Sequence, residues 1–400
     1  MKILMLTPYL PFPLLSGGQI RTYNLLKNLS AKHQITLFSL IKDESEKKHV
    51  PELKKFCHKV VLLKRTKKPF HLRNIILAGL SKYPFLVTRN LPKNGKALIK
   101  KELASKNYDL IHAETFYMMP NLPETPIPVI LVEQTIEYLG YLSYVKKSKF
   151  KPLKPLLYYD IKKIRHWEQY FWQKADKLIT MSADDSHFIQ NEVNARLDID
   201  VVANGVDISF FNQVKKRLPQ APTVLSVGTF KWLPNVDAVE FLVQKIWPKI
   251  IRQLPNAKLH IVGFSPHQKI LDYGKDPAIK ISGNIKDIRQ AYSKAHVLLA
   301  PVRSGKGTRF KILEAMATAT PIVATPLAVE GLAVKANQHA LVGSTASQLA
   351  NQTIKLLTDE KLQRLLAENG KKLVETNYSW KQISAKLDHI YQELGKKTRN

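Results

Sequence analysis

Cysteine is almost absent from this chain, which has one, Cys57, among 400 residues. A single cysteine excludes a disulfide within the chain and favours a reducing compartment. No uninterrupted apolar run approaches the roughly 20 residues that a membrane-spanning helix needs. Residues 1–15 are apolar, but three prolines interrupt them, which favours a first β-strand over a secretion signal. We therefore expect a cytoplasmic protein. Contact with the inner face of a membrane is left open.

Acidic residues are scarce, since 32 Asp and Glu stand against 62 Lys and Arg and give a net charge of +30. Such an excess predicts acidic partners: nucleic acid, anionic lipid or phosphorylated substrates. The basic residues are spread over many segments and form no nucleic-acid motif, so a basic binding module for nucleic acid or membranes is the weaker alternative. We expect no nucleic-acid partner.

Residues 144–177 interleave basic side chains with aromatic ones, including Tyr159, Trp167 and Trp172. Such a segment fits a membrane-surface element, with its aromatics at headgroup depth and its lysines on anionic lipid. It equally fits an ordinary helix whose aromatics pack inward. Of the two interpretations, we favour the packed helix.

Both halves of the chain alternate short β-branched runs with helical patterns, and the length suggests two domains. This pattern is typical of doubly wound α/β domains with mostly parallel sheets. No Gly-x-Gly-x-x-Gly follows the first strand of the second half, where residues 227–232 read VGTFKW, which argues against a dinucleotide oxidoreductase. The expected strands are residues 2–7, 34–39, 58–63, 109–113, 129–133, 178–182 and 200–203, then 224–227, 259–262, 279–282, 297–300, 322–324 and 340–342.

Residues 301–325 are the strongest candidate for the chemistry, because they read as a strand end, a Gly-containing turn, a helix and a further strand. Thr308 is expected to cap a helix that runs to about Ala319. Such a turn directs backbone N–H groups and the positive end of a helix toward the crevice at the strand ends, which suits a diphosphate. Arg309 and Lys311 add positive charge there.

Glu314 is an unusual residue in this expected helix, because most of its neighbours are apolar and predict a largely buried element. A buried carboxylate needs a partner. One candidate partner is Lys311, one turn back in the helix. The other is a pair of ligand hydroxyl groups, and both alternatives stay open.

The same stretch resembles the donor-site signature of retaining glycosyltransferases of family 4, which have the GT-B fold. Glu314 matches the second Glu of the family's Glu-x7-Glu pattern, and residues 315–317 and 321–323 match the positions that follow. Lys306 stands in place of the first Glu. Residues 305–315 instead resemble a subgroup that reads Gly-x-Gly-Thr-Arg-x-Lys-x-Leu-Glu-Ala. Whether Lys306 alters recognition of the donor sugar is left open.

The resemblance implies a GT-B architecture of two Rossmann-like domains that face each other across a cleft. Residues 1–203 would be the acceptor domain and residues 204–377 the donor domain. Residues 378–400 would form a helix that crosses back to the first domain. The segment Asn204-Gly205-Val206-Asp207 is similar to the family's junction between its two lobes.

The resemblance also assigns site residues. Glu314 would hold the donor ribose, and His112, expected at the carboxyl end of a strand, would contact the transferred sugar. Glu133 and Glu137 would touch the acceptor, unless they are exposed loop carboxylates. The residues expected at the donor diphosphate are Gly17, Gly18, Lys231, Arg309 and Lys311.

The function implied is retaining transfer of a sugar from a nucleotide-diphosphate sugar to a glycan or lipid-linked acceptor, in the manner of a hexosyltransferase. Neither a metal nor a separate cofactor is expected, because basic residues and a helix terminus stabilise the leaving diphosphate. The basic composition fits cell-envelope polysaccharide assembly. A nucleotide-sugar epimerase of the same fold is the alternative and would need acidic acid/base residues in the cleft. The base, sugar, acceptor and oligomeric state stay undefined.

Overall fold

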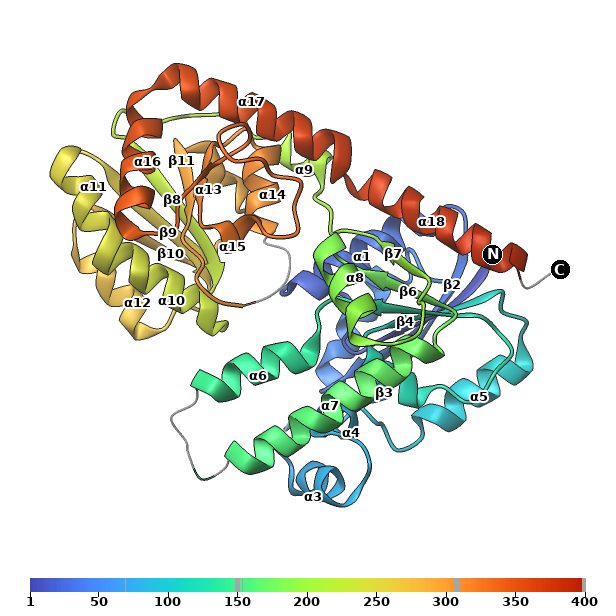
Figure 1. Cartoon of the computed structure of the whole chain (residues 1–400). Coiled ribbons are helices and arrows are strands. Elements are labelled where there is room, and N and C mark those ends of the chain that lie inside the picture. Colours follow the sequence, from blue (N-terminus) through green and yellow to red (C-terminus); the bar gives the residue numbers. More distant parts are fainter. Residues whose placement is uncertain (69, 148–151, 153, 306–309, 398–400) are drawn as a thin grey trace. The chain divides into compact units, whose positions relative to one another are not determined.

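The computed structural model in Figure 1 describes residues 1–68, 70–147, 152, 154–305 and 310–397. The chain divides into two compact units. The first unit comprises Met1–Ala203 together with Ile383–Asn400, and the second comprises Asn204–Gln382. Each unit contains its own parallel sheet and its own buried apolar core.

The first unit is built on a seven-stranded sheet of order β3-β2-β1-β4-β5-β6-β7, in which all neighbours are parallel. Strands β1, β4 and β5 are buried along almost their whole length, as strands of a sheet covered on both faces are. All seven strands were predicted, β1 and β5 with their observed bounds. The strands are β1 (Lys2–Thr7), β2 (Gln34–Ile41), β3 (Lys59–Lys64), β4 (Leu110–Glu114), β5 (Val129–Glu133), β6 (Lys177–Thr180) and β7 (Ile199–Val201).

The second unit has a six-stranded parallel sheet of order β10-β9-β8-β11-β12-β13. Its six strands were also predicted, β11 and β12 with their observed bounds and the others to within two residues at each end. The strands are β8 (Thr223–Thr229), β9 (Lys258–Phe264), β10 (Ile279–Gly283), β11 (Val297–Ala300), β12 (Ile322–Ala324) and β13 (Leu341–Val342). The expected fold class, two doubly wound parallel sheets, is therefore confirmed.

Helices connect the strands in both units. Those of the first unit are α1 (Gly17–Leu29), η1 (Glu44–His49), α2 (Val50–Leu53), α3 (Leu72–Leu80), α4 (Phe85–Thr88), α5 (Gly95–Ser105), η2 (Phe116–Asn121), α6 (Glu137–Lys147), α7 (Lys154–Lys174) and α8 (Ala183–Glu192). Those of the second are α9 (Ile208–Phe211), α10 (Leu233–Phe241), η3 (Leu242–Ile246), α11 (Trp247–Gln253), α12 (Gln268–Asp272), η4 (Tyr273–Lys275), α13 (Arg289–Ser293), α14 (Phe310–Ala317), α15 (Pro326–Val329), α16 (Ala346–Thr358) and α17 (Glu360–Asn377). The last helix is α18 (Trp380–Lys397).

The basic, aromatic segment 144–177 forms the end of α6 and the long helix α7. Trp167, Phe171 and Trp172 of α7 are buried, so these aromatics pack inward. Tyr159, nearer the start of α7, is 56% exposed. Along the described residues, no helix combines the length and the apolar character needed to cross a membrane.

The segment after β7 needs a glycine for close packing. A Cβ on Gly205 would lie 2.9 Å from both the Tyr378 carbonyl oxygen and the Trp380 ring. The Val206 amide donates to that same carbonyl oxygen at 2.7 Å. Asp207 then caps α9 by accepting from the Phe210 amide. The Asn-Gly-Val-Asp motif is thus a compact turn that packs against residues 378–380.

Asn235 does not cap the helix that follows β8. It lies inside α10, whose N-cap is Trp232, because Pro234 occupies the first turn and favours an earlier start. The Asn235 side chain instead donates from Nδ2 to the carbonyl oxygen of Thr229 at 3.0 Å.

Most of α18 belongs to the first unit and places one apolar face on it. Leu387, Ile390 and Tyr391 of this face are buried. Tyr391 also contacts the ring of His112 on β4, with 2.6 Å between its hydroxyl oxygen and Nδ1. With the ring proton assigned to Nε2, which bonds to the carboxylate of Glu114, Nδ1 of His112 accepts from the Tyr391 hydroxyl.

Replacing Tyr391 by phenylalanine should destabilise the protein, because it leaves a buried ring nitrogen without its donor. A loss of about 1–3 kcal/mol is expected for an unsatisfied buried acceptor, measured by denaturant unfolding. Tyr144→Phe is the control, since Tyr144 is 61% exposed and should tolerate the change. Equal stability of the two variants would contradict this role of Tyr391.

Candidate functional site

Polar side chains gather in the first unit where β1, β4 and β5 end. Parallel α/β sheets bind ligands at this carboxyl edge. Gln134, directly after β5, donates from Nε2 to Glu114 Oε2 at 2.6 Å and to the Tyr9 hydroxyl at 2.7 Å. Gly18, in the first turn of α1, leaves room for this contact, because a Cβ there would lie 2.2 Å from the Tyr9 hydroxyl oxygen.

Glu114 is the charged centre of this group and is fully buried. Burial pushes the pKa of Glu114 up, but hydrogen bonds from His112 and Gln134 and the charge of Arg21 outweigh it, so the pKa lies below its ordinary value. Arg21 is also buried and donates from Nη1 to the Ala203 carbonyl oxygen at 2.9 Å. The edge therefore holds a buried carboxylate and a buried guanidinium at close range.

His112 does not occupy the place that the sequence suggested. It lies in the middle of β4, paired with Met5 and Ile130, because the strand continues to Glu114. Its ring is fully buried, and both nitrogens are hydrogen-bonded, to Glu114 and Tyr391. Glu114 is the residue at the strand end, which sequence reasoning missed although its position could have identified it. Contact of His112 with a transferred sugar stays a prediction.

Gly17 and Gly18 form the start of α1. Ser16 is the N-cap, and its hydroxyl oxygen accepts from the Gln19 amide at 3.4 Å. The helix start lies beside Tyr9, as the Gly18 contact shows. A role of the two glycines at a donor diphosphate is untested.

Glu133 and Glu137 are not exposed loop carboxylates, so that alternative is wrong. Glu133 ends β5, is 2% exposed, and accepts from Trp172 Nε1 at 3.1 Å. Burial and then the nearby charge of Glu168 raise the pKa of Glu133 well above its usual value. Glu137 begins α6, and burial raises its pKa to about 7, against the opposing charge of Arg89.

Glu168, which the sequence analysis did not single out, fixes the start of α6. This buried residue of α7 accepts from the backbone amides of Glu137 at 2.7 Å and Tyr138 at 3.0 Å. A carboxylate is favoured at a helix N-terminus, where amides lack internal partners. Three carboxyl groups therefore converge next to the carboxyl end of β5.

In the second unit, Glu314 on α14 pairs with a residue that neither alternative from the sequence included. The Tyr292 hydroxyl donates to Glu314 Oε2 at 2.9 Å. No hydrogen bond joins Oε1 to another described residue. Burial raises the pKa of Glu314, although the Tyr292 bond and the charge of Lys311 oppose this. One oxygen of this half-buried carboxylate is thus held by Tyr292, while the other has no hydrogen-bond partner among the described residues.

Lys311 and Asn235 link Glu314's helix to the end of β8. Lys311 Nζ donates to Asn235 Oδ1 at 3.2 Å, and Asn235 donates in turn to the Thr229 carbonyl oxygen. Lys231 lies in the loop after β8, is exposed, and has its Nζ 5.0 Å from the centre of the Phe264 ring. Lys231 therefore follows the carboxyl end of β8 in the chain, and Lys311 is linked to that end through Asn235.

Arg303 is a further cation near this edge that the sequence analysis missed. It follows β11 and forms an ion pair with Asp237 at 2.6 Å. Its guanidinium carbon lies 4.2 Å from the centre of the Phe241 ring. Lys306, the expected cap Thr308 and the expected diphosphate ligand Arg309 lie outside the described residues.

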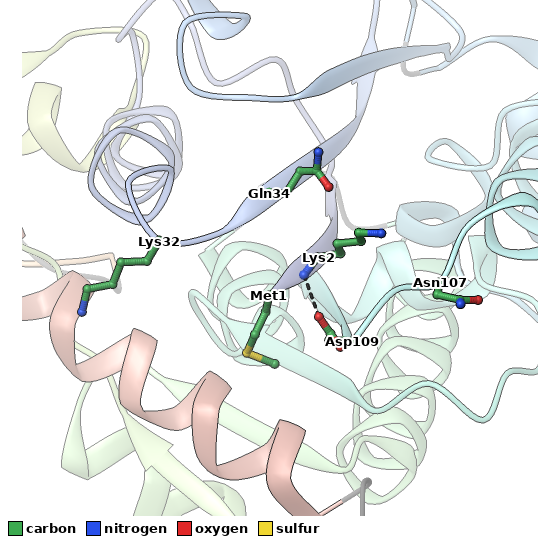
Figure 2. A pocket seen from close by; sticks show the side chains of 6 residues that line it. All are labelled: Met1, Lys2, Lys32, Gln34, Asn107 and Asp109. Carbon is green, nitrogen blue, oxygen red and sulfur yellow. Dashed lines mark hydrogen bonds between the residues drawn. The ribbon is translucent and has the colours of Figure 1, made fainter.

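A separate hollow lies at the opposite edge of the first sheet (Figure 2). At this amino edge, the Lys2 amide donates to Asp109 Oδ2 at 2.8 Å. The lining residues are Met1, Lys2, Lys32, Gln34, Asn107 and Asp109. Because doubly wound sheets bind their ligands at the other edge, we do not assign this hollow to a donor or acceptor.

The raised pKa of Glu137 predicts a pH-dependent stability. Its pKa is about 7 in the folded protein against an ordinary 4.5, so the folded state loses stability as the pH rises from about 4.5 to 7. Glu137→Gln should remove this loss, and its melting temperature should exceed that of the original protein at pH 8 but not at pH 5. Glu368→Gln, at an exposed position of α17, is the control and should show no such crossover. A constant difference between Glu137→Gln and the original protein across this range would contradict the shift.

Comparison with known proteins places both halves of the chain among glycosyltransferases. Residues 15–210 match the family model described as Glycosyltransferase Family 4. Residues 221–359 match the model described as Glycosyl transferases group 1. Together the two matches include both candidate sites.

Individual relatives cover nearly the whole chain at low identity. An uncharacterised 44.6 kDa protein in the cps region of Klebsiella pneumoniae is 20% identical, over 96% of this chain and 98% of its own. The solved structure of sucrose-phosphate synthase from Thermosynechococcus elongatus superposes with a TM-score of 0.75 at 19% identity, over 98% of this chain and 99% of its own. The structure of Anabaena Alr3699/HepE in complex with UDP and glucose has a TM-score of 0.66 at 16% identity, over 98% and 100% of the two chains.

The two parallel-sheet units agree with the fold of these structures, and the two family models together match most of the chain to glycosyltransferases. The chain is therefore a glycosyltransferase with the GT-B fold.

Proposed function

We propose that this protein transfers a sugar from a nucleotide-diphosphate sugar to a glycan or lipid-linked acceptor, with retention of the anomeric configuration. The observation that carries the proposal is the setting of Glu314, whose Oε2 is held by Tyr292 while Oε1 has no hydrogen-bond partner among the described residues. A carboxylate oriented in this way accepts hydrogen bonds from a ribose diol. The complex of Alr3699/HepE with UDP supports a uridine nucleotide as the first donor to try.

The diphosphate would lie between the end of β8 and the start of α14. Lys311, fixed by Asn235, would neutralise its charge together with Lys231 and Arg309. Positive side chains and a helix N-terminus stabilise a leaving diphosphate without a metal ion. The reaction is accordingly proposed to need no metal and no additional cofactor.

In the proposed reaction, the bond between the anomeric carbon and the diphosphate oxygen breaks. The acceptor hydroxyl forms its new bond to that carbon from the same face, and an oxygen of the leaving diphosphate accepts its proton. Glu133 and Glu137 are the proposed acceptor contacts, since they lie at the carboxyl end of β5. The relative from the cps region supports an acceptor in envelope polysaccharide assembly.

Nucleotide binding should raise the melting temperature. A ligand at 100 times its dissociation constant adds about 2.7 kcal/mol, which for a unit of this size is a rise of roughly 5–10 °C. The measurement is thermal unfolding with UDP, GDP, ADP, CMP and dTDP and their sugars. Glu314→Gln should abolish most of the rise, because a hydrogen bond to a charged group contributes about 1.5–3 kcal/mol.

Glu240→Gln is the matched control for this experiment. Glu240 is another carboxylate of the second unit, on α10, and pairs with Lys269 on the surface. The Glu240→Gln variant should keep the full rise in melting temperature with nucleotide. If Glu314→Gln keeps it too, the assignment of Glu314 is wrong; if no nucleotide raises the melting temperature of the original protein, the donor site itself is wrong.

Product analysis tests the reaction. With the donor identified in this way, we expect sugar transfer that requires an acceptor, that persists in EDTA, and that preserves the donor's anomeric configuration in the proton NMR spectrum of the product. Conversion of the nucleotide sugar without any acceptor would instead establish the epimerase. Inversion at the anomeric carbon or loss of turnover in EDTA would contradict the retaining or metal-independent part of the proposal.

A further inference from the structure

Helix α3 of the first unit exposes apolar side chains that a globular protein would ordinarily bury. Of its residues 72–80, only Asn74 is buried. Leu72 is 68% exposed and Leu80 is 85% exposed, and Phe70, just before the helix, is 78% exposed. Ile75, Ile76 and Leu77 are also exposed. An ordinary amphipathic helix turns such residues toward the core, so α3 is an exception that requires an explanation.

Polar contacts hold α3 in place, and its apolar side chains are left outward. Lys163 of α7 donates to the carbonyl oxygens of Ala78 at 2.7 Å and Ser81 at 2.8 Å. Asn74 donates to the Thr66 hydroxyl at 2.8 Å. The helix is therefore anchored by its backbone and by one polar side chain, with the apolar side chains available for another contact.

The first turns of α7 extend the same apolar surface. Leu156 is 62% exposed, and Tyr159 follows it at helical spacing. Lys163, which binds the carbonyls of α3, lies with its Nζ 4.9 Å from the centre of the Tyr159 ring. This face of α7 consequently adjoins α3, as Figure 1 also shows. We call Phe70, α3, Leu156 and Tyr159 the α3 surface.

The part of the chain that carries α3 is uniformly basic. No Asp or Glu occurs in residues 53–101, which contain 14 Lys and Arg. Lys68, Arg73 and Lys82 are exposed beside the apolar residues. Lys82 Nζ lies 5.3 Å from the centre of the Trp167 ring, so its ammonium group stands over an aromatic face at the edge of this surface.

We propose that the α3 surface docks on an anionic lipid bilayer. Aliphatic side chains, aromatic rings and flanking lysines are the combination that binds at headgroup depth, where apolar groups enter the acyl boundary and cations meet phosphates. A protein groove that received α3 would match its apolar stripe but would leave the surrounding positive charge without counterions. The proposal rests on exposure and charge and does not depend on the sugar transfer proposed above.

Vesicle flotation tests the docking. The full-length protein should bind vesicles of phosphatidylcholine and phosphatidylglycerol at 3:1 and bind pure phosphatidylcholine at least tenfold more weakly. The triple variant Leu72→Ser, Ile76→Ser, Leu80→Ser should lower the partition coefficient on the anionic vesicles at least tenfold. Leu271→Ser, Leu365→Ser is the matched control, since these leucines of the second unit are 42% and 52% exposed, and it should bind like the original protein.

The charge variant Lys68→Glu, Arg73→Glu separates lipid charge from apolar contact. It should lose the preference for anionic vesicles while retaining the weak binding to phosphatidylcholine. Both variants should keep their melting temperature and their response to nucleotide, because the changed side chains are exposed and lie in the first unit. Loss of vesicle binding with an unchanged nucleotide response therefore distinguishes a failure of docking from a failure of the donor site.

Three results would overturn the docking proposal. One is the original protein failing to bind anionic vesicles, and another is the triple variant binding them as well as the original. The third is self-association, measured by sedimentation velocity, that the triple variant abolishes while vesicle binding is unchanged. That last outcome would assign the surface to a second copy of the chain.

Discussion

The charge of Glu114 has to be compensated inside the protein, because the carboxylate is fully buried at the end of β4. Several otherwise separate features follow from this requirement. Gln134 and His112 supply hydrogen bonds, and Arg21 supplies the opposite charge. The compensation extends to α18, because His112 in turn accepts from Tyr391. The C-terminal helix therefore completes a polar network that begins at the carboxyl edge of the first sheet.

The same edge of each sheet gathers carboxyl groups whose pKa values differ because their partners differ. Glu114 has hydrogen-bond donors and a nearby cation, and its pKa is lowered. Glu133 is buried, accepts from Trp172 and has the charge of Glu168 close by, and its pKa is raised. Burial raises the pKa of Glu314 as well, and the hydrogen bond from Tyr292 and the charge of Lys311 partly oppose this rise. Divergent environments for similar side chains are typical of sites that bind or transform ligands.

The apolar surface of α3 is governed by a different balance. Packing alone would turn its leucines and isoleucines inward, but hydrogen bonds from Lys163 and Asn74 position the helix with those residues outward. By sequence, residues 144–177 fitted either a membrane-surface element or a packed helix, and the packed helix was favoured. The tryptophans of that segment are buried, and the densest run of exposed apolar residues lies on α3 instead. Aromatic content was a poor guide, because Trp167 and Trp172 contribute more to stability inside the core than at a surface.

The sequence by itself determined how many strands there are, where they lie along the chain and that they run parallel. Buried parallel strands are short β-branched runs, which the local pattern identifies. The sequence also located Glu314 and the loop after β5. Only the tertiary structure decided which groups satisfy the buried carboxylates. Tyr292 is 22 residues from Glu314, and Tyr391 is 279 residues from His112. No local spacing specifies such pairs, because they depend on how helices pack on the sheets, and packing is a property of the whole fold.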